Sequence, residues 1–217
     1  MAEMQRDNLI RDGARAPGLL RQALMGVFIA PRATLRAWYS ADPDAITVLL
    51  RLTLPMILFS VTAAAWAHAA IPSPFPAATR PDPLAFAIYS ALTQLTGVLA
   101  LAAMGHFLCD LFCGRSDFRR ALAAVSVALV PAWVANVAAA LPWPWGAHLG
   151  LAGILYSLVL LYAAFAIILG VTRGDRLGHY CASLGGAALV TFAVGWQLVS
   201  LIPGAAPATR LGTTWLI

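Results

Sequence analysis

LTQLTGVLALAAMGHFLCDLFCGRSDFRRALAAVSVALVPAWVANVAAAL, residues Leu92–Leu141, holds two long apolar runs separated by a short charged segment. A helix that spans a membrane needs about 20 predominantly apolar residues. Both runs are continuous rather than alternating, which favours helices over the strands of a closed barrel. The stretch therefore predicts two membrane-spanning helices joined by a polar turn.

The same pattern extends over most of the chain. The 217 residues are 61% hydrophobic and 11% charged, with a mean hydropathy of +0.80, whereas about a quarter of the residues of a soluble domain are charged. We therefore expect an all-α integral membrane protein with five transmembrane helices. The expected spans are 46–70, 84–108, 119–141, 148–171 and 180–202.

The arginines predict the topology. All 14 basic residues are arginine, and arginine is enriched in cytoplasmic loops. Twelve fall on one side of the predicted bundle: Arg6, Arg11, Arg15, Arg21, Arg32, Arg36, Arg51, Arg115, Arg119, Arg120, Arg173 and Arg176. We expect a cytoplasmic segment 1–45, a membrane domain 46–203 and a short external tail 204–217. Ser116 is expected to cap the helix that begins near Asp117 or Phe118.

The segment before the first span, PGLLRQALMGVFIAPRATLRAWYS, residues 17–40, predicts a broken amphipathic helix. Leu24, Val27 and Phe28 form an apolar face with helical spacing, and Pro31 interrupts the helix. Arg32 and Arg36 lie one turn apart. Two interpretations remain open: a helix at the cytoplasmic membrane interface near anionic headgroups, and a short helix packed on the end of the bundle.

Few polar side chains fall within the spans. Gln94, Asn136 and Gln197 are placed there, where such groups usually form hydrogen bonds between helices. Alternatively they line a polar path for a small solute. No Asp or Glu lies near the middle of a predicted span, which weighs against a proton-coupled pump.

Histidines and cysteines gather near the cytoplasmic side. His106, Cys109 and Cys113 share one helical face, and His179 and Cys181 begin the last span. This spacing is not the paired C-x-x-C form that is typical of zinc sites. We expect no metal and no cofactor; these five residues are the candidates for a metal- or thiol-dependent membrane enzyme.

Three stretches of the sequence resemble the Yip family, whose Rab-interacting members have five spans and a cytoplasmic N-terminus. They are VFIAPRATLRAW (27–38), FCGRSDFRRALAAVSVALVPAW (112–133) and LYSLVLLYAAFAIILGVTRGDRLGHY (155–180). The second stretch matches the family pattern at Phe112, Gly114, Ser116 and Pro131. The likeness extends from Pro17 to Ile202, and the sequence is similar to the short bacterial form of the family. The long acidic N-terminal region of eukaryotic members is absent, so Rab binding is not carried over.

The resemblance implies membrane organisation and protein–protein binding, and it establishes no catalytic residue. We expect a non-enzymatic scaffold or accessory subunit of the bacterial inner membrane that binds another membrane protein or organises lipid. The expected contact residues are Arg32, Arg36, Trp38 and Arg51. A transporter or channel and the metal- or thiol-dependent enzyme are the alternatives. Nucleic acid is not an expected partner, because no basic groove interleaved with aromatics is present.

Overall fold

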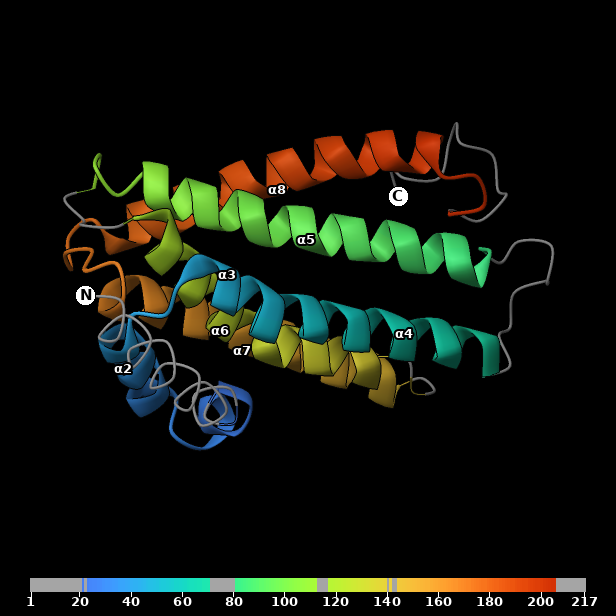
Figure 1. Cartoon of the computed structure of the whole chain (residues 1–217), viewed down its shortest axis with the longest axis horizontal. Coiled ribbons are helices and arrows are strands. Elements are labelled where there is room, and N and C mark those ends of the chain that lie inside the picture. The colour runs from blue at the N-terminus through green and yellow to red at the C-terminus, as the bar shows by residue number, and fades with distance from the viewer. Residues whose placement is uncertain are drawn as a thin grey trace, which may run out of the picture.

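The computed structural model describes residues 21, 23–70, 81–112, 117–139, 141 and 144–205, apart from the side chains of 68 and 69. Within these residues it is all-α (Figure 1). Five stretches of helix are long and apolar enough to cross a membrane, and a short helix precedes them. This confirms the predicted fold class. The helices are α2 (Pro31–Ala41), α3 (Ala45–Val48), η1 (Leu49–Thr53), α4 (Leu54–Ala70), α5 (Pro83–Phe107), α6 (Phe118–Ala138), α7 (Trp145–Ile167) and α8 (Arg176–Leu201).

The ends of the long helices differ from the predicted spans by a few residues. The helix α8 begins at Arg176 rather than near 180, because its first turn is polar and hydropathy alone leaves it out. The helix α6 begins at Phe118 with Asp117 as its N-cap, and the Asp117 carboxylate accepts a hydrogen bond from the Arg120 backbone N–H at 2.8 Å. Asp117 therefore has the capping role that we expected of Ser116, which lies outside the described residues.

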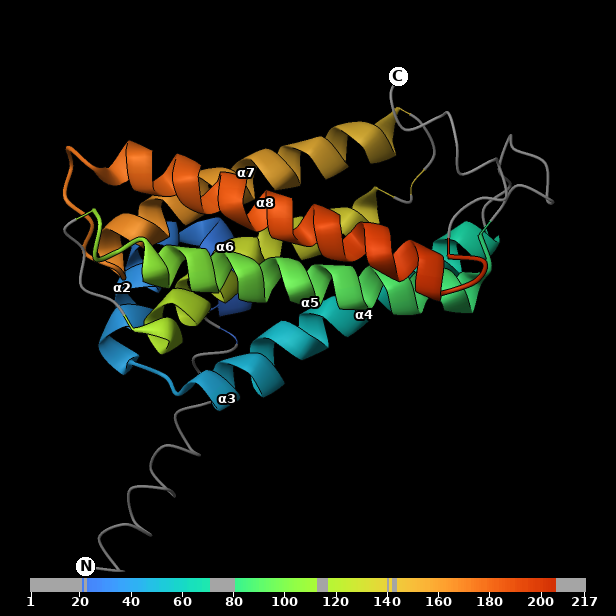
Figure 2. The same cartoon turned by 90° about the horizontal axis from the view of Figure 1, so that it is seen from above.

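The long helices run side by side, with α6 at the centre. The helix α6 packs against α7, α5 and α4, and 67% of its most apolar 18 residues are buried, against 11% for those of α8. The helix α8 packs mainly along α5, as Figure 2 shows, and Figure 1 shows it at the edge of the bundle. The helix α8 therefore exposes large apolar side chains, among them Leu189, Phe192 and Trp196.

The first span contains a turn of π-helix, η1. It ends at Thr53, two residues before Pro55, a residue that has no backbone N–H and whose ring crowds the carbonyl four residues earlier. The wide turn, in which the Leu54 N–H bonds the Leu49 carbonyl, accommodates the proline inside the span. Thr53 lies at its end and shares a hydrogen bond of 2.8 Å with Ser126 of α6. A polar pair between spans thus fixes the irregular turn.

Asp44 caps the start of this span. Its carboxylate accepts backbone N–H groups of Thr47 at 3.1 Å and Ile46 at 3.3 Å. The hydrogen bond from Thr47 is the main cause that lowers the pKa of Asp44 below its ordinary value. Because the folded pKa is depressed, the stabilisation is complete above the pKa of an unfolded aspartate, about 4, and is lost as pH falls through the folded pKa.

We expect Asp44→Ala to destabilise the protein by about 1 kcal/mol at neutral pH, since the cap is lost. The difference from the wild type should shrink as the pH falls below about 4. Thermal unfolding in detergent over a pH series measures it. Asp44→Asn keeps a capping oxygen without the charge and is the control, expected to lose much less stability. Equal losses in both variants at neutral pH would show that capping is not the cause.

Two short helical segments precede the first span. Residues 23–29 are helical, the helix is interrupted at Ala30, and Pro31 is the first residue of α2. This confirms the predicted interruption at Pro31. The helix α2 packs on α6 and α7, and Leu35 and Trp38 are buried. In α2, therefore, the apolar face is covered by the bundle.

Candidate functional site: the arginine-rich end

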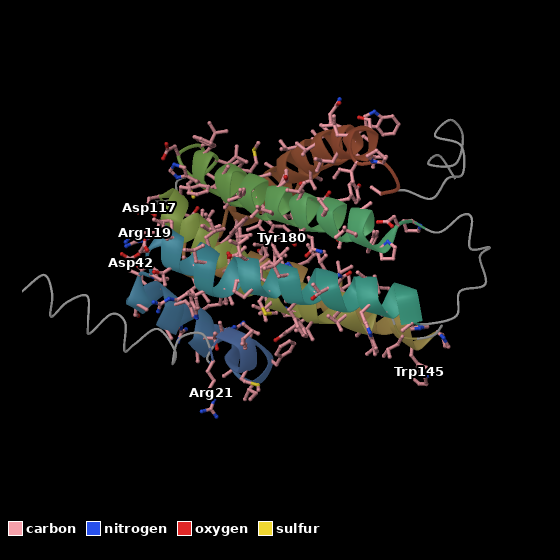
Figure 3. All side chains as sticks on the ribbon, turned by 45° about the vertical axis from the view of Figure 1, so that its right-hand side comes forward. Arg21, Asp42, Asp117, Arg119, Trp145 and Tyr180 are labelled. Carbon is pink, nitrogen blue, oxygen red and sulfur yellow. The ribbon has the colours of Figure 1, made fainter. Side chains whose placement is uncertain are left out.

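One end of the bundle gathers charged side chains around Asp42. The Arg119 Nη2 lies 2.7 Å from one carboxylate oxygen of Asp42, and the Arg120 Nε lies 3.2 Å from the other. Arg119 also pairs with Asp117 at 3.5 Å. Figure 3 shows Asp42, Asp117 and Arg119 together at this end, with Trp145 at the opposite end. We call the end with Asp42 the arginine-rich end.

The backbone conformation of Asp42 suits its position at the end of α2. It ends α2 in the left-handed conformation, with φ of 42°, and its backbone N–H bonds the Trp38 carbonyl. Aspartate tolerates this conformation better than most side chains. The Arg120 guanidinium also lies over the ring of Tyr39, at 5.5 Å from its centroid. Asp42 therefore fastens the end of α2 to the start of α6.

We expect Asp42→Asn to loosen α2 without unfolding the bundle. The side chains of the Arg119–Asp42 pair are 37% and 36% exposed, so each ion pair contributes at most about 1 kcal/mol. Asparagine keeps the left-handed backbone and removes only the charge. Hydrogen–deuterium exchange in detergent should show faster exchange for residues 31–41.

Asp110→Asn is the matched control, because Asp110 is an exposed aspartate that follows α5, and it should leave exchange in α2 unchanged. If Asp42→Asn also leaves it unchanged, the fastening role of Asp42 is wrong.

The four predicted contact residues fall into two groups. Arg32 and Arg36 are exposed on α2, and Arg51 is exposed on η1. Trp38 is only 5% exposed and packs inwards with Leu35. Its indole nitrogen has no hydrogen-bond partner among the described residues. The three arginines are open to a partner or to lipid, whereas the position of Trp38 gives it a packing role.

The three polar side chains predicted within the spans have different environments. Asn136 donates to Ser60 of α4 at 2.8 Å, and Gln94 donates to Ser90 of its own helix at 3.2 Å. Gln197 is exposed on α8. Within the described chain, no hydrogen bond joins any two of the three. Asn136 thus links two spans, as such groups commonly do.

Of the histidine and cysteine candidates, His179 and Cys109 are in contact with each other. His179 is fully buried; its Nε2 lies 3.0 Å from the Gly105 carbonyl oxygen and 3.6 Å from Cys109 Sγ. The rings of Phe112 and Phe165 enclose it edge-on. Cys181 is exposed on α8, and Cys113 lies outside the described residues.

His106 is partly buried, and its ring lies beside that of Phe107. Among the residues that the structure describes, no group of three His, Cys, Asp or Glu side chains is placed to hold a metal ion. The contact of His179 with Cys109 and Gly105 joins α8 to α5, and packing explains it.

Two contact residues, one at the arginine-rich end and one in the middle of α7, were not predicted from the sequence. Asp42 is one, because the arginines with which it pairs lie 77 and 78 residues away in the chain and no local pattern connects them. Tyr156 was read only as part of a span. Its hydroxyl donates to the Val27 carbonyl at 2.6 Å, a contact across 129 residues that no local pattern announces.

Of the comparisons with known proteins, only the one with protein families gives a match. No curated protein and no solved structure matches the chain. The sequence profile of the Yip1 domain matches residues 25–195, which cover the short N-terminal helix and all but the end of the last span. The predicted family is confirmed, and with it a multispan membrane protein: the chain belongs to the Yip1 domain family.

Proposed function

We propose that the protein is a non-enzymatic scaffold or accessory subunit that binds another integral membrane protein or organises lipid. The observation that carries the proposal is the exposure of three arginines, Arg32 and Arg36 on α2 and Arg51 on η1, together with the ion pairs by which Asp42 fastens α2 to α6. Members of the Yip1 family are generally non-enzymatic membrane proteins of trafficking. Exposed arginines on a rigid support suit binding to acidic or phosphate groups.

We further infer the location and orientation. The predicted topology assigns twelve of the arginines to the side of the N-terminal segment, and this bias supports a cytoplasmic N-terminus and a periplasmic C-terminus in the bacterial inner membrane. The division into a cytoplasmic segment 1–45, a membrane domain 46–203 and an external tail 204–217 follows from the same bias.

Purification from native membranes in mild detergent tests the role. We expect native mass spectrometry to find a stoichiometric complex with another integral membrane protein, because a scaffold acts through bound partners. Arg32→Ser, Arg36→Ser and Arg51→Ser should each reduce the bound fraction. Arg173→Ser is the control, since Arg173 is an exposed arginine between α7 and α8. A wild-type protein that is recovered only as a lone chain would contradict the binding of another membrane protein and leave lipid as the ligand of these arginines.

A small-solute transporter is the second candidate. It is favoured by the Gln94 Oε1 and the Thr93 hydroxyl of α5, which are buried and have no hydrogen-bond partner among the described residues. Unpaired polar groups in a span are costly unless they contact a solute or water. Proteoliposomes that take up a solute, with uptake abolished by Gln94→Leu and retained in Gln197→Leu, would favour this candidate.

A further inference from the structure

The helical segment of residues 23–29 lies against the middle of a span. Tyr156, which bonds the Val27 carbonyl, stands eleven residues from both ends of α7, Trp145 and Ile167. At 1.5 Å per residue, that is about 17 Å from each end of the helix. The ring of Phe28 also stacks on Tyr156, with centroids 6.3 Å apart. A hydrocarbon core of about 30 Å that covers α7 therefore reaches the depth of this segment.

The segment is apolar on both of its sides. Ala23 and Val27 are fully buried against the bundle, whereas Met25, Phe28 and Ile29 are 62%, 48% and 82% exposed. A short surface helix in water normally turns polar residues outwards. Large apolar side chains on the outward side instead suit an apolar medium.

Arginines flank this apolar segment, and acidic residues do not. From Gly13 to Ala41 the charged residues are Arg15, Arg21, Arg32 and Arg36. Arg21 is exposed and points away from the bundle in Figure 3, and Arg32 and Arg36 are exposed on α2. Long arginine side chains can extend from an apolar environment to lipid phosphates. The charges therefore complement an anionic membrane surface.

We propose that Arg21 and residues 23–36 belong to a monotopic element embedded in one leaflet of the bilayer. In this arrangement Met25, Phe28 and Ile29 lie among the acyl chains of the leaflet on the arginine-rich side. Arg21, Arg32 and Arg36 bind anionic headgroups of the same leaflet. The proposal deepens the proposed function by naming lipid as the ligand of Arg32 and Arg36, and it rests on that function only for the side of the membrane.

Spin labelling measures the depth of the segment directly. The chain keeps the fully buried Cys109, carries serine at Cys113 and Cys181, and receives one nitroxide-labelled cysteine at Ile29, Val159 or Ser40. Val159, on α7, is 64% exposed and is the lipid-facing reference, and Ser40 is exposed at the end of α2. The protein is reconstituted in vesicles of phosphatidylcholine and phosphatidylglycerol, without any partner.

We expect the label at 29 to resemble that at 159, with high accessibility to oxygen and low accessibility to an aqueous nickel chelate. The label at 40 should show the reverse. A label at 29 that behaves like the one at 40 would overturn the proposal, and so would low accessibility to both reagents, which means that protein covers the segment. Because no partner is present, this result is separate from the detergent purification that tests the scaffold role.

The headgroup contacts have their own test. Spin-labelled phosphatidylglycerol should be immobilised more than phosphatidylcholine by the wild-type protein, and this preference should fall in the Arg21→Gln, Arg32→Gln, Arg36→Gln variant. Arg173→Gln should keep it. An unchanged preference in the triple variant would overturn the assignment of anionic lipid to these arginines.

Discussion

Replacement of Gly153 by alanine should lower the melting temperature in detergent far more than replacement of Gly185. Gly153 lies where α7 packs most closely on α6. A Cβ at this position would overlap the Cβ of Ala135 and come within 3.0 Å of the Pro131 carbonyl oxygen. Neither is the flexible end of a long side chain, so the two helices must move apart.

We expect a cost of roughly 1–3 kcal/mol or more for this overpacking, which corresponds to about 2–4 °C per kcal/mol for a chain of this size. Gly185 is the matched control: it faces outwards on α8, and nothing lies within 4 Å of an added Cβ. Gly185→Ala should be neutral or slightly stabilising, because alanine has the higher helix propensity. Similar melting temperatures for the two variants would contradict the close α6–α7 contact.

Ser157→Ala should also destabilise the bundle substantially. Ser157 of α7 is 2% exposed, and its hydroxyl accepts a hydrogen bond of 2.8 Å from the Ala132 backbone N–H, next to Pro131 inside α6. A proline within a span disturbs the helical ladder, and neighbouring side chains often satisfy the affected groups. The alanine variant leaves a buried amide without this acceptor.

The expected loss is about 1–3 kcal/mol, measured by thermal unfolding in detergent. Ser200→Ala is the control, since Ser200 is exposed and bonds only the Gln197 carbonyl of its own helix within the described chain. We expect less than about 0.5 kcal/mol from it. If Ser157→Ala has the same melting temperature as Ser200→Ala, the hydroxyl of Ser157 does not support α6.

The sequence predicted the spans because a span is a local property. Continuous apolar runs, and prolines or charges at their ends, place each helix to within a few residues, and Pro31 marks the break before α2. The irregular turn η1 was not predicted. Its form depends on Thr53 meeting Ser126, a contact between helices that periodicity does not reveal.

The candidate site was only partly predictable for the same reason. Exposure of Arg32 and Arg36 follows from their spacing on one helix, whereas the burial of Trp38 depends on how α2 rotates against α6 and α7. Arg119 and Arg120 were read as topology markers, and their pairing with Asp42 needs the three-dimensional arrangement. Gln94, Asn136 and Gln197 look alike in sequence, but the rotation of each helix gives each a different environment.

We infer that the arginine-rich end, with α2 fastened to it, faces the cytoplasm. Labelling with a membrane-impermeant maleimide in right-side-out membrane vesicles tests it, on chains with serine at Cys113 and Cys181 and one new cysteine. The positions are Ser40, Arg173 and Trp145, which are all exposed, with Trp145 at the opposite end. We predict that the cysteine at 145 reacts in intact vesicles, and that those at 40 and 173 react only after permeabilisation. Reaction at 40 or 173 in intact vesicles would contradict the cytoplasmic location of the arginine-rich end.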